Sequence, residues 1–162
     1  MTAQTWLPIL TLALGWAGAQ ATEMYRHRTA SRRERQARRD ELQRNTLLEL
    51  QDALLDASKL ASQAQLEEFV ATLPELDDRG RREADERIRE AHNRFYQASG
   101  RCRLLLSRVQ DEEARGTAAF FLAAAGIVAQ YNPETDEADS KRARESYGKT
   151  IDLLGKLIRE RY

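Results

Sequence analysis

Apolar residues recur at steps of three and four along the chain after Leu42, which is the spacing of one face of an α-helix. We expect an amphipathic helix that ends near Leu73, because Pro74 disfavours helical geometry at the residue before it. A linker follows, with Asp77 or Asp78 as the cap of the next helix. The apolar stripe and the leucines that widen it are Leu47, Leu50, Leu54, Ala57, Ala61 and Ala64, with Leu48, Leu55 and Leu60.

A second stripe alternates steps of four and three without interruption. Its members are Ala84, Ile88, Ala91, Phe95, Ala98, Cys102, Leu105 and Val109. This is a heptad seam, and arginines and glutamates fill much of the outer face of the predicted helix. We expect a break between Gln110 and Gly116, where charges replace the apolar residue that the seam requires. Asp111 is the expected cap of the helix that follows.

An uncharged stretch over 117–129 comes next, and it is short for a membrane span. We expect a helix buried among its neighbours, with a re-entrant or second membrane segment as the alternative. A final helix, capped by Thr135 or Asp136, has a predicted inner face of Ala143, Tyr147, Ile151, Leu154 and Ile158. Pro and Gly are scarce, with 3 and 8 residues. The predicted fold class is all-α: an N-terminal transmembrane helix continues into the long first helix of an antiparallel bundle of about four helices.

The start of the chain has a different pattern, because no charged side chain occurs over 6–22. A helix over 6–25 is about 28 Å long, close to a hydrocarbon core of about 30 Å. Rings of the type that settles at the headgroup level stand at both ends, and a proline lies in the first turn, where its missing N–H costs nothing. We therefore predict a transmembrane anchor over 1–25, with the anchor residues Trp6, Pro8, Trp16 and Tyr25.

Arginines crowd the flank after this anchor, whereas residues 1–5 contain no Lys or Arg. The positive-inside rule then places the N-terminus outside the cell membrane and the bulk of the chain in the cytoplasm. We expect a basic juxtamembrane helix over 26–41 and a cytoplasmic helical bundle over 42–162. Nucleic acid is not an expected partner, because no aromatic residue or motif supports base reading. Anionic membrane lipids are the expected partners of Arg26, Arg28, Arg32, Arg33 and Arg35.

Small residues recur along one face of the anchor, and small faces let membrane helices approach closely. This face is a candidate seam for a homo-oligomer, and it consists of Thr11, Gly15, Gly18 and Thr22. Two alternatives to a membrane anchor stay open. Residues 19–21, Ala-Gln-Ala, fit the cleavage pattern of a secretory signal peptide, which would make the remainder an exported helical domain. The segment is also compatible with a water-soluble amphipathic or buried helix.

Composition and motifs argue against catalysis. The 26 basic and 26 acidic side chains give a net charge of zero, so the overall charge points to no class of partner. The one cysteine, Cys102, excludes an internal disulfide. His27 and His92 stand apart, so no metal site is predicted, and His92 is expected at the edge of the bundle. Cys102 occupies a seam position, where inert packing is expected despite the neighbouring arginines. Since glycine-rich phosphate loops and nucleophile motifs are missing, we expect neither a cofactor nor an enzyme.

Three segments resemble the opening of uncharacterised small single-pass helical membrane proteins of actinobacterial type. They are 6–16 (WLPILTLALGW), 32–40 (RRERQARRD) and 47–54 (LLELQDAL). The resemblance covers mainly the first third of the chain, implies the layout of anchor plus bundle, and carries over no functional residue. The predicted function is a membrane-tethered helical interaction or scaffold module with an unknown protein partner. A phage- or defence-related membrane effector is the alternative, beside the exported domain.

Overall fold

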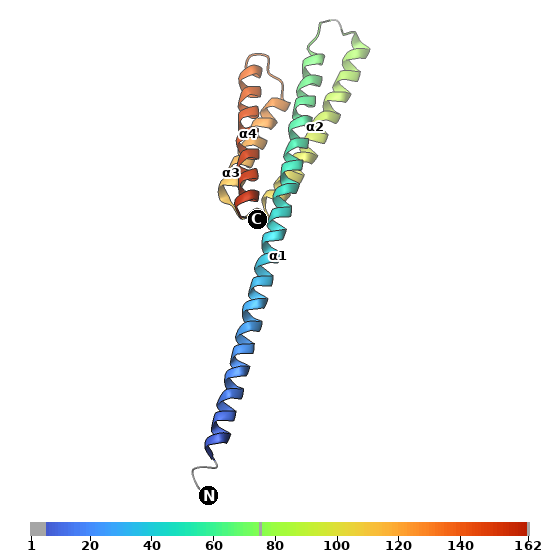
Figure 1. Cartoon of the computed structure of the whole chain (residues 1–162). Coiled ribbons are helices and arrows are strands. Elements are labelled where there is room, and N and C mark those ends of the chain that lie inside the picture. Colours follow the sequence, from blue (N-terminus) through green and yellow to red (C-terminus); the bar gives the residue numbers. More distant parts are fainter. Residues whose placement is uncertain (1–5, 75, 162) are drawn as a thin grey trace. The chain divides into compact units, whose positions relative to one another are not determined.

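The computed structural model describes residues 6–74 and 76–161. This part of the chain is all-helical, as predicted, and Figure 1 shows its four helices. They are α1 (Trp6–Ala71), α2 (Asp78–Leu106), α3 (Glu112–Ala129) and α4 (Asp136–Arg161). The chain divides into two compact units, Met1–Glu41 and Leu42–Tyr162, and α1 contributes to both.

The unit Leu42–Tyr162 is a helical bundle built from the second half of α1 and the other three helices. Short connections over 72–77, 107–111 and 130–135 make consecutive helices antiparallel (Figure 1). Side-chain contacts hold the elements together. Arg87 Nε of α2 lies 3.1 Å from Glu67 Oε2 of α1, and the rings of Phe121 in α3 and Tyr147 in α4 lie 5.3 Å apart.

The core of the bundle confirms the predicted stripe on α1. All six residues of the stripe are at most 2 % exposed, and its three leucines are buried against residues of the other helices. Each buried leucine contributes about 1.5–3 kcal/mol relative to an exposed one. Two of the leucines expected to widen the stripe, Leu48 and Leu55, are instead about two-fifths exposed, at 41 % and 40 %. The buried stripe consists of Leu47, Leu50, Leu54, Ala57, Ala61 and Ala64.

Two aspartates cap the helices that they were expected to cap. Asp77 Oδ1 accepts a hydrogen bond of 2.6 Å from Gly80 N at the start of α2. Asp111 Oδ1 accepts one of 3.0 Å from Ala114 N at the start of α3. The break between these helices comes earlier than predicted, because α2 already ends at Leu106. The chain then turns tightly enough to return Val109 to the core at 2 % exposure.

The inner face of α4 differs from the predicted one. Its buried residues are Ser146, Thr150, Leu154 and Leu157, and only Leu154 was expected. The two hydroxyl groups bond within their own helix, because Ser146 Oγ donates to Ala143 O at 2.9 Å and Thr150 Oγ1 donates to Ser146 O at 2.8 Å. A hydroxyl that is satisfied locally packs like a small apolar group, so these positions face the core at little cost. Four predicted inner residues are only partly buried: Ala143, Tyr147, Ile151 and Ile158.

α3 is buried on one side only, which corrects the expectation of a helix surrounded by its neighbours. Its inner residues include Ala118, Phe121 and Ala125, each at most 2 % exposed. On the other side, Phe120 is 57 % exposed and Ile127 is 48 % exposed. The helix therefore has an apolar surface on both its inner and its outer face.

The prediction of a transmembrane helix over 1–25 is not supported. Across the described residues, no helix combines the length and the apolar character that a membrane span requires. The physical reason lies in the composition of the segment. Pro8, Thr11, Gln20 and the glycines dilute its Leu and Ile residues, and Glu23 follows before a full span is complete.

Candidate functional site

The residues predicted as the membrane anchor lie at the start of α1. Trp16 is 68 % exposed within the described chain. The side chains of Trp6, Pro8 and Tyr25 lie outside the described residues, so their expected role as interfacial anchors stays a prediction. The same is true of the expected association face, formed by Thr11, Gly15, Gly18 and Thr22.

The arginines of the unit Met1–Glu41 whose side chains are described are all exposed along α1. Two nearby carboxylates bind other side chains, because Glu34 binds Arg38 and Asp40 binds Gln36 within the same helix. Four of the five arginines assigned to lipid contact make no ion pair within the described chain, and the side chain of Arg28 lies outside it. Exposed, unpaired guanidinium groups attract phosphate and carboxylate groups. The four arginines are Arg26, Arg32, Arg33 and Arg35.

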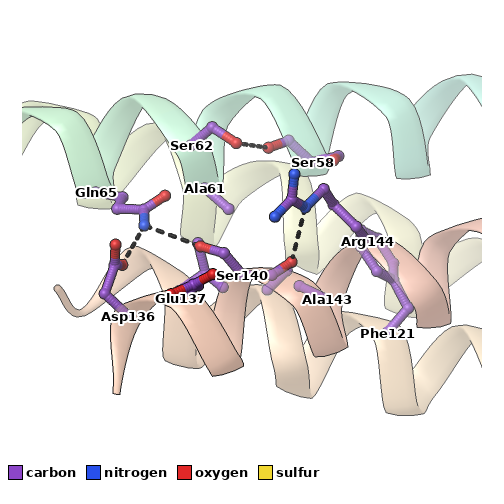
Figure 2. Close-up of a pocket in the computed structure, with 12 residues that line it drawn as sticks. Ser58, Ala61, Ser62, Gln65, Phe121, Asp136, Glu137, Ser140, Ala143 and Arg144 are labelled. Carbon is purple, nitrogen blue, oxygen red and sulfur yellow. Dashed lines mark hydrogen bonds between the residues drawn. The ribbon is translucent and has the colours of Figure 1, made fainter. Parts of the chain in front are cut away.

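The unit Leu42–Tyr162 has a pocket of about 500 Å³ between α1, α3 and α4. Its floor is apolar and includes Ala61 of α1 with Phe121 and Ala125 of α3. Its rim is polar and comes from α1 and α4. Figure 2 shows the rim residues along these two helices, with Gln65 of α1 pointing toward Asp136 and Ser140 of α4. The rim residues are Ser58, Ser62, Gln65, Asp136, Glu137, Ser140 and Arg144.

Gln65 links the two helices that form the rim of this pocket. Its Nε2 donates to Asp136 Oδ1 and, at 3.0 Å, to Ser140 Oγ (Figure 2). Arg144 Nε donates to the main-chain oxygen of Ser140 at 3.3 Å, which turns the guanidinium group along α4. Asp136, expected as a helix cap, therefore sits in the first turn of α4 and binds α1 instead.

The pocket can bind an apolar group beneath a polar rim, and its volume lies within the range of small-molecule sites. Its described lining holds hydroxyl, amide, carboxylate and guanidinium groups, and it includes no histidine or lysine that could act as a base for its serines. The arrangement supports binding better than acyl or phosphoryl transfer. One signal for the pocket was readable in advance, namely the polar cluster Ser58, Ser62 and Gln65 at helical spacing beside the buried stripe.

His92 and Cys102 take the structural positions expected of them. His92 lies at the edge of the bundle with its side chain 19 % exposed, and its Nε2 is 3.1 Å from Glu68 Oε1 of α1, although the angle is not that of a hydrogen bond. Cys102 is fully buried. Burial raises the pKa of its thiol from 9.0 to about 11. A thiol that stays protonated is a poor nucleophile, so packing accounts for this residue.

The described residues contain no group of three or more His, Cys, Asp or Glu side chains arranged to hold a metal ion. Comparisons of the chain with protein-family models, with curated proteins and with solved structures give no match. The resemblance to small single-pass membrane proteins therefore stays a prediction. Any function has to be argued from the chemistry of the two units themselves.

Proposed function

We propose that the chain is a membrane-tethered helical interaction module. The first unit supplies the tether, and the four-helix unit supplies the surfaces that bind a protein partner. One observation carries the proposal: α1 is a single helix from Trp6 to Ala71 whose residue chemistry changes twice along its length. It is uncharged over 6–22, arginine-rich over 26–39, and apolar on its core-facing side from Leu47 onward.

The uncharged part of α1 favours a lipid environment. Two tryptophans and a run of Leu and Ile residues lose free energy when they leave water for an apolar environment. Trp16 is 68 % exposed within the described chain, so this apolar surface is not covered by the protein itself. The unpaired arginines that follow add an attraction to anionic headgroups of about 1 kcal/mol for each well-placed side chain. Both contributions act at the same end of the chain, so they reinforce each other.

The orientation follows from the same charges. Translocating a cluster of arginines is costly, so the arginine-rich side of the tether stays in the cytoplasm together with the four-helix unit. The residues before Trp6 carry no Lys or Arg and lie on the opposite side. Cleavage of the four-helix unit by a protease added outside intact spheroplasts would contradict this orientation.

Binding is the activity that the four-helix unit supports best. Its pocket has an apolar floor and a hydrogen-bonded rim, and its surface has exposed aromatic and aliphatic side chains, such as Phe120 and Ile127. Large exposed apolar side chains in groups are typical of surfaces that receive partners. The expected partner is a protein, because the unit presents helix faces with exposed apolar side chains.

The tether is tested by fractionation of cells that produce the full chain. We expect the protein to sediment with membranes and to remain there after a wash with high salt. Leu12→Glu places a charge in the middle of the uncharged stretch, at a cost of about 3 kcal/mol in a bilayer, and should release the protein. Leu104→Glu is the matched control, because Leu104 is 68 % exposed on α2, outside the tether. Wild-type protein in the supernatant, or equal release by both variants, would overturn the proposal.

A further inference from the structure

The outer face of α3 is apolar, whereas the outer face of α2 carries arginines and glutamates along most of its length. No charged side chain occurs over 116–133. Five residues of α3 are exposed on one face of the helix, and they include a phenylalanine and an isoleucine. We call this set the α3 face. It consists of Gly116, Ala119, Phe120, Ala123 and Ile127.

A row of charged residues on α4 borders the α3 face. A groove of about 370 Å³ is lined by Gly116, Thr117 and Phe120 from α3 and by Arg142, Glu145, Ser146 and Lys149 from α4. The apolar and the charged side chains therefore belong to one surface. Asp152 is exposed three residues after Lys149 and extends the row.

The side chains of the α3 face alternate in size. Gly116 is small, Phe120 is large, Ala123 is small and Ile127 is large, at steps of four, three and four. The spacing of four, three and four is the same when the helix is followed in the opposite direction. The order of sizes then changes from small-large-small-large to large-small-large-small. An antiparallel second copy of α3 therefore sets a large side chain opposite a small one at every position, with Phe120 opposite Ala123 of the other copy.

The charged row of α4 has the same kind of pattern. Arg142, Glu145, Lys149 and Asp152 alternate between positive and negative at steps of three, four and three. Reversing the row exchanges the signs at every position. An antiparallel second copy of α4 therefore pairs Arg142 with Asp152 and Glu145 with Lys149 across the interface, so that all four contacts are attractive.

The centres of the two patterns lie close together in the bundle. The pattern on α3 is centred between residues 121 and 122, and the pattern on α4 is centred on residue 147. The rings of Phe121 and Tyr147 are in contact, with their centroids 5.3 Å apart. One two-fold axis near these two rings therefore satisfies the sizes on α3 and the charges on α4 together.

We infer that the α3 face and the charged row of α4 form a homodimer interface, with α3 antiparallel to α3 and α4 antiparallel to α4 of a second copy. A two-fold interface uses one self-complementary patch, which is what these patterns provide. Alternating charges favour a protein surface with the opposite alternation over an anionic lipid surface. The interface lies in the unit Leu42–Tyr162 and is separate from the association face expected in the anchor.

Disulfide trapping of the full chain tests the pairing. Antiparallel pairing places residue 116 opposite residue 127 of the other copy, whereas two copies of residue 116 lie about 16 Å apart along the helix axis. The double variant Gly116→Cys/Ile127→Cys should give a covalent dimer on oxidation, and each single variant should not. Residues 116 and 127 of one chain are too far apart to join each other, and Cys102 is buried. An added side chain at residue 116 meets no atom within 4 Å.

Dimers from the single variants as abundant as those from the double variant would indicate parallel or random encounters and would overturn the inference. Absence of a covalent dimer from the double variant, in protein with wild-type circular dichroism, would also overturn it. The tether could still bind membranes in either case, so these outcomes are distinguishable from failure of the proposed function.

Charge exchange tests the register of the same interface. Glu145→Lys creates two symmetric repulsive contacts in the dimer, each between the new lysine of one copy and Lys149 of the other. The variant should weaken dimerisation about tenfold or more. Sedimentation equilibrium in density-matched detergent measures this change. Glu145→Lys/Lys149→Glu restores opposite charges and should restore dimerisation. Glu90→Lys breaks a pair with Arg94 on α2, outside the interface, and should have no effect. If the double variant stays as weak as Glu145→Lys, the proposed register is wrong.

Discussion

α2 and α3 both bury an apolar seam in the same core, yet their outer faces have opposite chemistry. The outer face of α2 carries arginines and glutamates along most of its length, and several of them pair with residues one turn away. The outer face of α3 carries no charge at all after Arg115. Each face has one exposed aromatic ring, Tyr96 on α2 and Phe120 on α3, and both rings are 57 % exposed.

The difference shows that the exposed fraction of an aromatic ring does not by itself identify an interface, because the residues around the ring decide whether the surface is hydrated. Tyr96 has a hydroxyl group that water can bond, and it stands among Asn93, Arg94 and Gln97. Phe120 has no polar atom and stands among glycine and alanines. Charged and polar side chains hydrate most of the outer face of α2, whereas the outer face of α3 has none after Arg115 except at its end. The face of α3 is better explained by contact with a second apolar surface.

The largest expected effect concerns the inner faces, where the two helices should behave alike. Phe95 of α2 and Phe121 of α3 are 3 % and 1 % exposed. Truncating either to alanine removes the contacts of a buried ring and leaves a cavity, which costs about 3–5 kcal/mol. Urea unfolding of Phe95→Ala and Phe121→Ala should give similar losses. A loss below about 1 kcal/mol for either variant would show that its helix is not anchored in the core as described.

The second effect separates the inner faces, because only α2 buries a thiol in the described core. Burial raises the pKa of Cys102 from 9.0 to about 11, so the folded protein holds this proton more tightly than the unfolded chain. The stabilisation is complete below about pH 9 and is lost as the pH rises towards about 11. Its magnitude is at most about 3 kcal/mol.

Urea unfolding between pH 8 and 11 measures this loss. Other groups also titrate in this range, so the comparison is between the slopes of wild type and Cys102→Ala. The alanine variant should lose less stability over the interval, since it has no thiol to deprotonate in the unfolded chain. Parallel curves for the two proteins would contradict the burial of an ionisable group at this position.

A smaller effect concerns the caps of the two helices. Asp77→Ala removes a side-chain acceptor at the start of α2 and should cost about 1 kcal/mol. Asp111→Ala should cost more, because Asp111 Oδ2 also lies 2.9 Å from Arg161 Nη1 at the end of α4. The added loss should stay below about 1 kcal/mol, because Arg161 is largely exposed. Asp111→Asn keeps the cap and loses the charge, so its thermal unfolding isolates the ion pair.

These caps belong to the part of the fold that the sequence predicts well. An aspartate just before an apolar periodic segment is a typical helix N-cap. The apolar steps of three and four in α1 and α2 define which face of each helix is buried. Both signals depend on neighbours in the sequence. Local chemistry was therefore sufficient for the helix starts, for the buried stripe of α1 and for the seat of Cys102 on the inner face of α2.

The rest was not readable from residue types, either because a polar side chain bonds within its own helix or because a contact joins residues far apart in the sequence. Ser146 and Thr150 look like surface residues until their hydroxyl groups are seen to bond their own helix. Gln65 and Asp136 form the rim of a pocket only because α1 and α4 lie side by side. The uncharged stretch of α3 predicted a helix, but the number of neighbours around it was not readable from its composition.

The smallest effect on stability, and the most direct test of the comparison, comes from the two exposed rings. Tyr96→Ser and Phe120→Ser change surface side chains, so each should alter the free energy of unfolding of the monomer by about 0.5 kcal/mol or less. Their effects on association should differ.

When a dimer forms only from folded chains, the unfolding temperature increases with protein concentration. That dependence should persist in Tyr96→Ser and disappear in Phe120→Ser, measured by calorimetry over a hundredfold range of concentration. If both variants keep it, the ring of Phe120 does not lie in an interface, and the contrast between the two outer faces has no consequence for assembly.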